Sequence, residues 1–111
     1  MHSFAREATF VSDIAQLSDT DIARATGVAP ATARAWLAGT RSPTGERAER
    51  LVELSSLVER LIRVIDPAYV AVWLRKPVPA LDEEKPIDVI RRGQYRRVAR
   101  LISELEEMPV T

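Results

Sequence analysis

The sequence predicts an all-α fold, and three observations lead to that prediction. Apolar residues recur at the three- and four-residue spacing of helices along most of the chain. No segment alternates apolar and polar residues for long enough to form a strand. Proline and glycine stand where helices would begin and end. With 111 residues, the chain is long enough for one core shared by two small helical regions, but too short for two independent domains.

Residues 12–39 are predicted to form three short helices. Ser18 and Asp19 are natural N-caps for a helix over 21–26 that stops at Gly27. Pro30 suits the first turn of the next helix, over 31–38, because its missing N–H would have no intrahelical partner there. Gly39 ends that helix. The apolar positions at helical spacing are Ile14, Leu17, Ile22, Ala23, Val28, Ala33, Trp36 and Leu37.

The clearest periodic signal follows a linker at residues 41–45 and predicts a helix over 46–65. A helix of about 20 residues is roughly 30 Å long, so we expect it to be the central strut of the molecule. Its apolar stripe comprises Ala48, Leu51, Leu54, Ser55, Val58, Leu61, Ile62 and Ile65.

In the rest of the chain, prolines mark where predicted helices begin and end. Asp66 is predicted as the N-cap of a short helix, with Pro67 at its first position. Pro77 and Pro79 then predict an extended passage. A short helix over 86–92 ends at Gly93, and the last helix should stop before residue 109, which is a proline. The apolar residues of the first of these helices are Tyr69, Val70, Val72, Trp73 and Leu74, and those of the last are Tyr95, Val98, Leu101, Ile102 and Leu105.

Composition excludes several classes of function. Hydrophobic residues make up 46% and charged residues 29%, which predicts a folded protein. The chain has no cysteine and one histidine, His2, so we expect no nucleophile–base pair, no enzymatic activity, no metal site and no cofactor. No apolar run approaches the roughly 20 residues that cross a bilayer, and no leader is evident, so we expect a cytoplasmic protein away from membranes.

The segment over 20–37 resembles the helix-turn-helix of Xre/Cro-type repressors. Ala23 stands where the two helices would cross, Gly27 at the turn, and Val28, Ala33 and Trp36 at the positions that fix the angle between the helices. Three short helices with this pattern can also pack together without any role in DNA binding.

The resemblance implies DNA binding, for which we single out Thr32, Arg34 and Arg41. Thr32 and Arg34 are the polar residues on a reading face that is otherwise alanine and proline, and Arg41 just past the helix could contact the phosphate backbone. Sixteen basic and sixteen acidic residues balance to zero, so the chain as a whole attracts a polyanion weakly. Specific binding would therefore need a homodimer that reads two half-sites.

The second half of the chain resembles the toxin-binding domain of Xre/MbcA/ParS-type antitoxins, and with the first half the resemblance covers residues 12–111. It divides the chain into a helix-turn-helix region (12–43), a connecting helix (44–66) and a toxin-binding domain (67–111). Many relatives have glycine where this chain has Lys85. The residues that carry the resemblance are Val72, Trp73, Leu74, Leu81, the run from Lys85 to Ile90, Gly93, and the run from Tyr95 to Ile102.

The resemblance implies a protein partner, a RES-domain toxin that destroys cellular NAD and is neutralised by occlusion of its active-site cleft. Arg92, Tyr95 and Arg96, with Trp73, have the aromatic and arginine content of binding hot spots. A tryptophan on a short amphipathic helix is, however, more often part of the core.

The chain end supplies a second candidate toxin contact: Glu107, Met108, Pro109, Val110 and Thr111. An acidic helix end with a stiff tail could imitate a pyrophosphate substrate in the toxin's cleft. The alternative is an ordinary fraying terminus.

The resemblance thus implies a type II antitoxin that inhibits its toxin and represses its own operon. A stand-alone Cro-like regulator, in which the C-terminal helices serve only dimerisation, is the alternative. A third interpretation is an adaptor whose helix-turn-helix no longer binds DNA.

Overall fold

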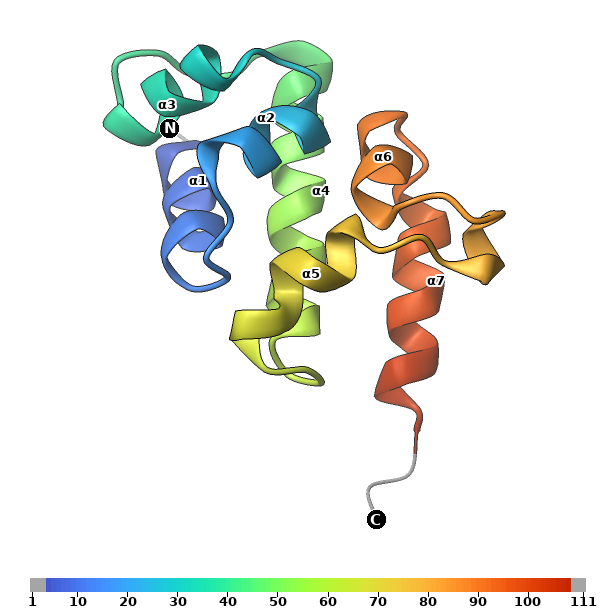
Figure 1. The fold of residues 1–111 in the computed structure, drawn as a ribbon. Helices are drawn as coiled ribbons and strands as arrows, with labels where there is room; N and C mark the ends of the chain where they lie inside the picture. The colour runs from blue at the N-terminus through green and yellow to red at the C-terminus, as the bar shows by residue number, and fades with distance from the viewer. Residues whose placement is uncertain (1–3, 109–111) are drawn as a thin grey trace.

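Helices build the part of the protein that the structure describes, residues 4–108 of a computed structural model (Figure 1). This confirms the all-α prediction; within those residues, the sole β-type pairing is one isolated bridge between Val78 and Glu84. The helices are α1 (Phe4–Asp13), α2 (Asp19–Thr26), α3 (Pro30–Ala38), α4 (Gly45–Leu61), α5 (Val70–Arg75), α6 (Pro86–Arg91) and α7 (Tyr95–Glu106), with short 3-10 helices η1 (Pro67–Tyr69) and η2 (Pro79–Leu81).

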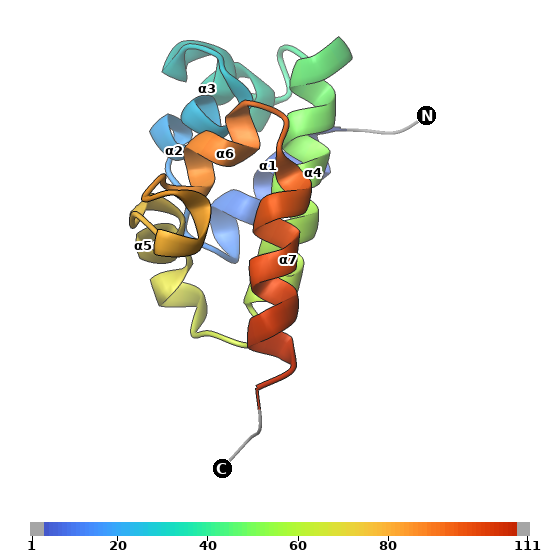
Figure 2. The same cartoon turned by 90° about the vertical axis from the view of Figure 1, so that its right-hand side faces the viewer.

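Helix α4 runs through the middle of the molecule, as predicted. Helices α1, α2 and α3 lie on one side of it, and α6 and α7 lie on the other (Figure 1). Figure 2 shows α7 running beside α4, with both helices beginning at the same end. Because α4 is covered from two sides, its buried face is wider than a single stripe, and Leu57, outside the predicted stripe, is fully buried with Leu54 and Leu61.

The predicted C-terminal end of the central helix was wrong. Helix α4 ends at Leu61, four residues before the expected end. The N–H groups of Arg63 and Val64 bond to carbonyls three residues back, so the chain leaves α-helical geometry there. Pro67 disfavours helical geometry at Asp66, and Ile65 is only half-buried, so little packing favours another helical turn.

The first helix begins earlier than the sequence predicted. We expected three helices within residues 12–39, but α1 spans Phe4–Asp13. It packs on α4 and α3, and its residues Ala8 and Val11 are fully buried. Ile14 follows the helix end and is 45% exposed, not a core residue.

The cap and proline predictions largely held. Asp66 accepts a hydrogen bond from the N–H of Ala68 at 2.9 Å and caps η1, which leads into α5. Helix α7 ends at Glu106, ahead of the proline at 109. The extended passage is shorter than predicted, because Pro79 begins η2 instead of continuing it.

Candidate functional site

The turn between α2 and α3 has the geometry that the sequence predicted. Ser18 caps α2: its Oγ accepts from the N–H of Asp21 at 3.1 Å, and an Asp21 carboxylate oxygen accepts from the N–H of Ser18 at 3.2 Å. Gly27 ends α2 at φ 78°, a left-handed conformation that favours glycine. The predicted buried positions Ala23, Ala33 and Trp36 are all buried, whereas Val28 is half-buried.

The predicted reading face on α3 carries one long polar side chain, and that side chain has an intramolecular partner. Arg34 is 61% exposed and its Nη1 lies 3.0 Å from Oδ2 of Asp19, at the start of α2. The hydrogen bond from Arg34 lowers the pKa of Asp19 below its ordinary value. Thr32 is half-buried, and Arg41, past the end of α3, is exposed. The neighbouring Ala29, Pro30 and Ala31 are exposed.

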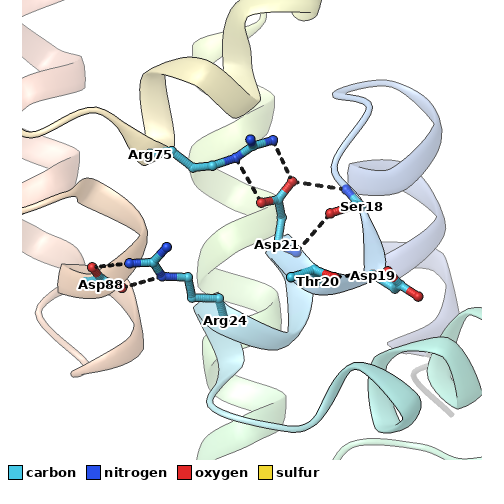
Figure 3. A network of polar contacts seen from close by, with 7 residues as sticks. All are labelled: Ser18, Asp19, Thr20, Asp21, Arg24, Arg75 and Asp88. Atoms are coloured by element: carbon cyan, nitrogen blue, oxygen red, sulfur yellow. Dashed lines mark hydrogen bonds and ion pairs between the residues drawn. The ribbon is translucent and has the colours of Figure 1, made fainter.

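Two ion pairs join the helix-turn-helix to the second half of the chain (Figure 3). Arg24 on α2 forms a bidentate pair with Asp88 on α6, with both N–O distances at 2.8 Å. Arg75 at the end of α5 donates to both carboxylate oxygens of Asp21 at 3.0 Å. Asp21 is buried, and its carboxylate takes part both in the cap of α2 and in the contact with α5. Sequence spacing gave no signal of these pairs, because their partners are 64 and 54 residues apart.

The predicted toxin-binding residues occupy the two ends of α7 and its approach. Arg92 follows α6 and forms an ion pair with Glu84. Tyr95 is half-buried and packs against the core, while Arg96 is exposed. At the far end, Glu107 and Met108 are exposed, and Met108 retains 63% of its accessible surface. The remaining tail residues, Pro109, Val110 and Thr111, lie outside the described residues.

The beginning and end of α7 are well separated. Twelve residues at 1.5 Å each place them roughly 18 Å apart. Within the described residues, the structure therefore does not bring Tyr95 and Arg96 together with Glu107 and Met108.

Helix α7 is fastened to α4 by one arginine. Arg60 donates to the Glu106 carboxylate at 2.5 and 3.2 Å and to Oγ of Ser103 at 2.9 Å. The hydrogen bond from Arg60 holds the pKa of Glu106 below its ordinary value. These contacts join the second half of α7 to α4.

An apolar groove between α5 and α7 was not found by sequence reasoning. It encloses about 410 Å³, and its lining residues are Trp73, Val78, Leu101, Glu104, Leu105 and Met108. The sequence showed Trp73, Leu101 and Leu105 as apolar stripes, but a stripe does not reveal whether another element covers it.

Within the described part, no group of histidine, cysteine and acidic residues is arranged to hold a metal ion. Nor does any helix there have the length and apolar character required to cross a membrane.

Comparison with known proteins places these features in a family. A helix-turn-helix family model matches residues 15–54. The mycobacterial cidal antitoxin MbcA of Mycobacterium tuberculosis H37Rv is 32% identical over 97 residues, which cover 87% of this chain and 76% of that protein. A second protein of that strain, the probable mycobacterial cidal antitoxin Rv3188, is 30% identical over 82 residues, covering 74% of this chain and 70% of its own length.

A solved structure is similar over nearly the whole chain. In the crystal structure of the M. tuberculosis MbcT–MbcA toxin–antitoxin complex, a chain with 26% identity aligns with a TM-score of 0.83, covering 99% of this chain and 100% of that one. The sequence identity to MbcA, the matching fold and the buried helix-turn-helix positions together show that this chain belongs to the MbcA family of antitoxins.

Proposed function

We propose that this chain is a type II antitoxin that acts in the cytoplasm, where its C-terminal half (residues 67–111) binds and inhibits a RES-type toxin that degrades NAD. The observation that carries the proposal is the likeness, over 99% of the chain, to a structure of a toxin–antitoxin complex. Inhibition by binding also fits a chain whose one histidine is His2 and which has no cysteine.

Two contact areas on the C-terminal half are proposed for the toxin. Arg92, Tyr95 and Arg96 lie near the start of α7, and Glu107 and Met108 lead into residues 109–111 at its end. The acidic chain end would oppose the positive or N–H groups that a toxin needs to hold a dinucleotide pyrophosphate. Deletion of residues 108–111 is then expected to weaken neutralisation far more than folding.

For the N-terminal half, we propose repression of the chain's own operon by a homodimer that contacts DNA through Thr32, Arg34 and Arg41. The helix-turn-helix geometry and family match support this proposal. The Arg34–Asp19 ion pair favours a second candidate, an adaptor whose helix-turn-helix does not bind DNA. Such an adaptor would neutralise toxin fully and would leave operator DNA unshifted at low salt.

Co-expression with the neighbouring gene tests the toxin partnership directly. If that gene encodes the toxin, the two chains are expected to co-elute in size-exclusion chromatography, and cells that carry both should survive. A toxin that elutes alone and kills cells in the presence of this chain would refute the proposal.

A further inference from the structure

The groove between α5 and α7 has no described element covering it. Trp73 and Val78 line one wall, and Leu101 and Leu105 line the other. Its volume of about 410 Å³ lies within the range of roughly 300–1,000 Å³ typical of pockets that bury a small ligand, which is enough room for a few apolar side chains. Resting on the toxin-binding function proposed above, we infer that this groove receives an apolar, basic-flanked segment of the toxin.

Helix α7 has more apolar surface than the core of this chain uses. Val98 and Ile102 are fully buried against the core. Leu101 and Leu105, on the adjacent face, are only half-buried, as is Trp73 across the groove. On an amphipathic surface helix the face outside the core is normally polar. A partner that covers these side chains would remove apolar area from water and anchor on a tryptophan, a residue enriched in binding hot spots.

The charge at the groove favours the toxin over a second copy of the chain. Glu104 is the one charged residue among those that line the groove, and Glu107 is exposed less than one turn beyond it. Arg60 on α4 is paired with Glu106, so this cation is not available to neutralise Glu104 and Glu107. In a two-fold symmetric contact between copies, each groove would meet the same acidic rim, which is unfavourable. A toxin segment with two or more large apolar side chains and an adjacent lysine or arginine fits both the lining and the charge.

Fluorine NMR on the intact chain tests this assignment without altering the groove. The chain is labelled with 5-fluorotryptophan at Trp36, which is buried, and at Trp73, and a Trp73→Phe variant assigns the two signals. The unlabelled probe is the cognate RES-type toxin of the proposed function, purified separately. On toxin addition the Trp73 signal is expected to shift and to lose its solvent isotope effect, whereas the Trp36 signal keeps its position.

Two variants and a matched control complete the test. Leu105→Asp places a charge inside the groove and should weaken toxin binding about tenfold or more. Glu104→Lys, at an exposed position that does not threaten the fold, should weaken binding most at low salt, because it repels the basic segment. Ile14→Asp changes an exposed apolar residue on the opposite side of α4, in a hollow on α1, and should leave toxin affinity unchanged.

The outcomes separate this inference from the proposed function. If toxin binds but the Trp73 signal stays in place and Glu104→Lys binds normally, the groove assignment is wrong and the antitoxin function stands. If the wild-type chain neither binds nor silences the toxin, the proposed function itself fails. A Trp73 signal that moves with the concentration of the chain alone would assign the groove to a second copy and overturn the inference.

Discussion

The Asp19 side chain occupies the arginine that the helix-turn-helix would use to contact DNA, Arg34. Arg34 stands on α3 where a helix-turn-helix reads bases, and its guanidinium lies 3.0 Å from the Asp19 carboxylate. Asp19 also places a negative charge at the start of α2. In a DNA complex, this end of the helix would face the DNA phosphates. DNA binding therefore requires Arg34 to exchange a carboxylate for a base or phosphate, and it leaves Asp19 without its partner.

Asp19→Asn is expected to tighten DNA binding, because it frees Arg34 and removes a negative charge beside the phosphates. Arg34→Ala should weaken it by about 1–3 kcal/mol, the usual cost of a lost base contact. Fluorescence anisotropy with a duplex from the chain's own promoter measures both effects at low salt. Asp13→Asn, an exposed acid at the end of α1, serves as the control. If Asp19→Asn bound DNA no better than the wild type, Arg34 would not be the reading residue.

At the scale of single helices, capping residues and prolines predicted where helices end. Features that depend on packing between helices were not predicted. Ser18, Gly27 and Pro30 act on their own neighbours in the chain, so the predicted helices end where α2 and α3 end, although α2 begins at Asp19 and α3 at Pro30, two residues and one residue earlier than predicted. The end of α4 depends instead on what packs against its last turn, and periodicity alone carried the prediction too far. Likewise, the early start of α1 was missed because Ala8 and Val11 are buried only through the packing of α1 on other helices.

Of the candidate sites, likewise, the one formed by residues close in sequence was predicted and the one formed between distant helices was not. The helix-turn-helix could be found from the spacing of Ala23, Gly27 and Trp36, because that motif is local in sequence. The groove could not be found, because Trp73 and Leu101 come from different helices and the sequence does not say that their facing sides stay uncovered. The pairing of Arg34 with Asp19 likewise joins different helices.

Leu61 on α4 offers a direct test of the core. It is fully buried at the last turn of the helix, so Leu61→Ala should lower the free energy of unfolding by about 2–5 kcal/mol through lost burial and a cavity. Val52→Ala on the same helix removes an exposed side chain and should change stability by less than about 0.5 kcal/mol. Urea unfolding of both variants makes the comparison. An unaltered transition for Leu61→Ala would mean that α4 buries a different face.

The contact between α4 and α7 should depend on pH. Because Arg60 lowers the pKa of Glu106 from its ordinary value of 4.5, the ionised carboxylate stabilises the folded state more than the unfolded one. This stabilisation is fully present above pH 4.5 and is lost as pH falls through the lowered pKa. The stability difference between wild type and Glu106→Gln should therefore be constant near neutral pH and shrink in acid. A difference that grew with acidification would contradict the assigned contact.

At the scale of the whole molecule, the two halves are one packed body. Helix α2 contacts α6, where Arg24 pairs with Asp88, and Arg75 at the end of α5 pairs with Asp21 on α2, so both pairs lie across the junction between the two halves (Figure 3). Exposed ion pairs contribute little, typically 0.2–1 kcal/mol, but the Asp21 carboxylate is buried and also caps α2. Asp21 therefore takes part both in the contact between the two halves and in the N-cap of α2.

A double-mutant cycle on Asp21 and Arg75 measures that dependence. Asp21→Asn should destabilise the fold more than Arg75→Ala, because the first loses both the ion pair and a charged cap acceptor. The two changes together should cost less than the sum of the single changes, since they remove one shared interaction. Strict additivity would show that the two side chains do not interact in solution.

Toxin inhibition by this chain is tested most directly by measuring NAD consumption by the purified toxin as the chain is titrated in. We expect NAD loss to fall to background once this chain saturates the toxin at a fixed stoichiometric ratio. Under the same conditions, Leu105→Asp should need a higher concentration to inhibit, and the Ile14→Asp control should match the wild type. Continued NAD consumption at full rate in the presence of a folded, excess antitoxin would contradict the central claim that this chain silences a RES-type toxin by binding it.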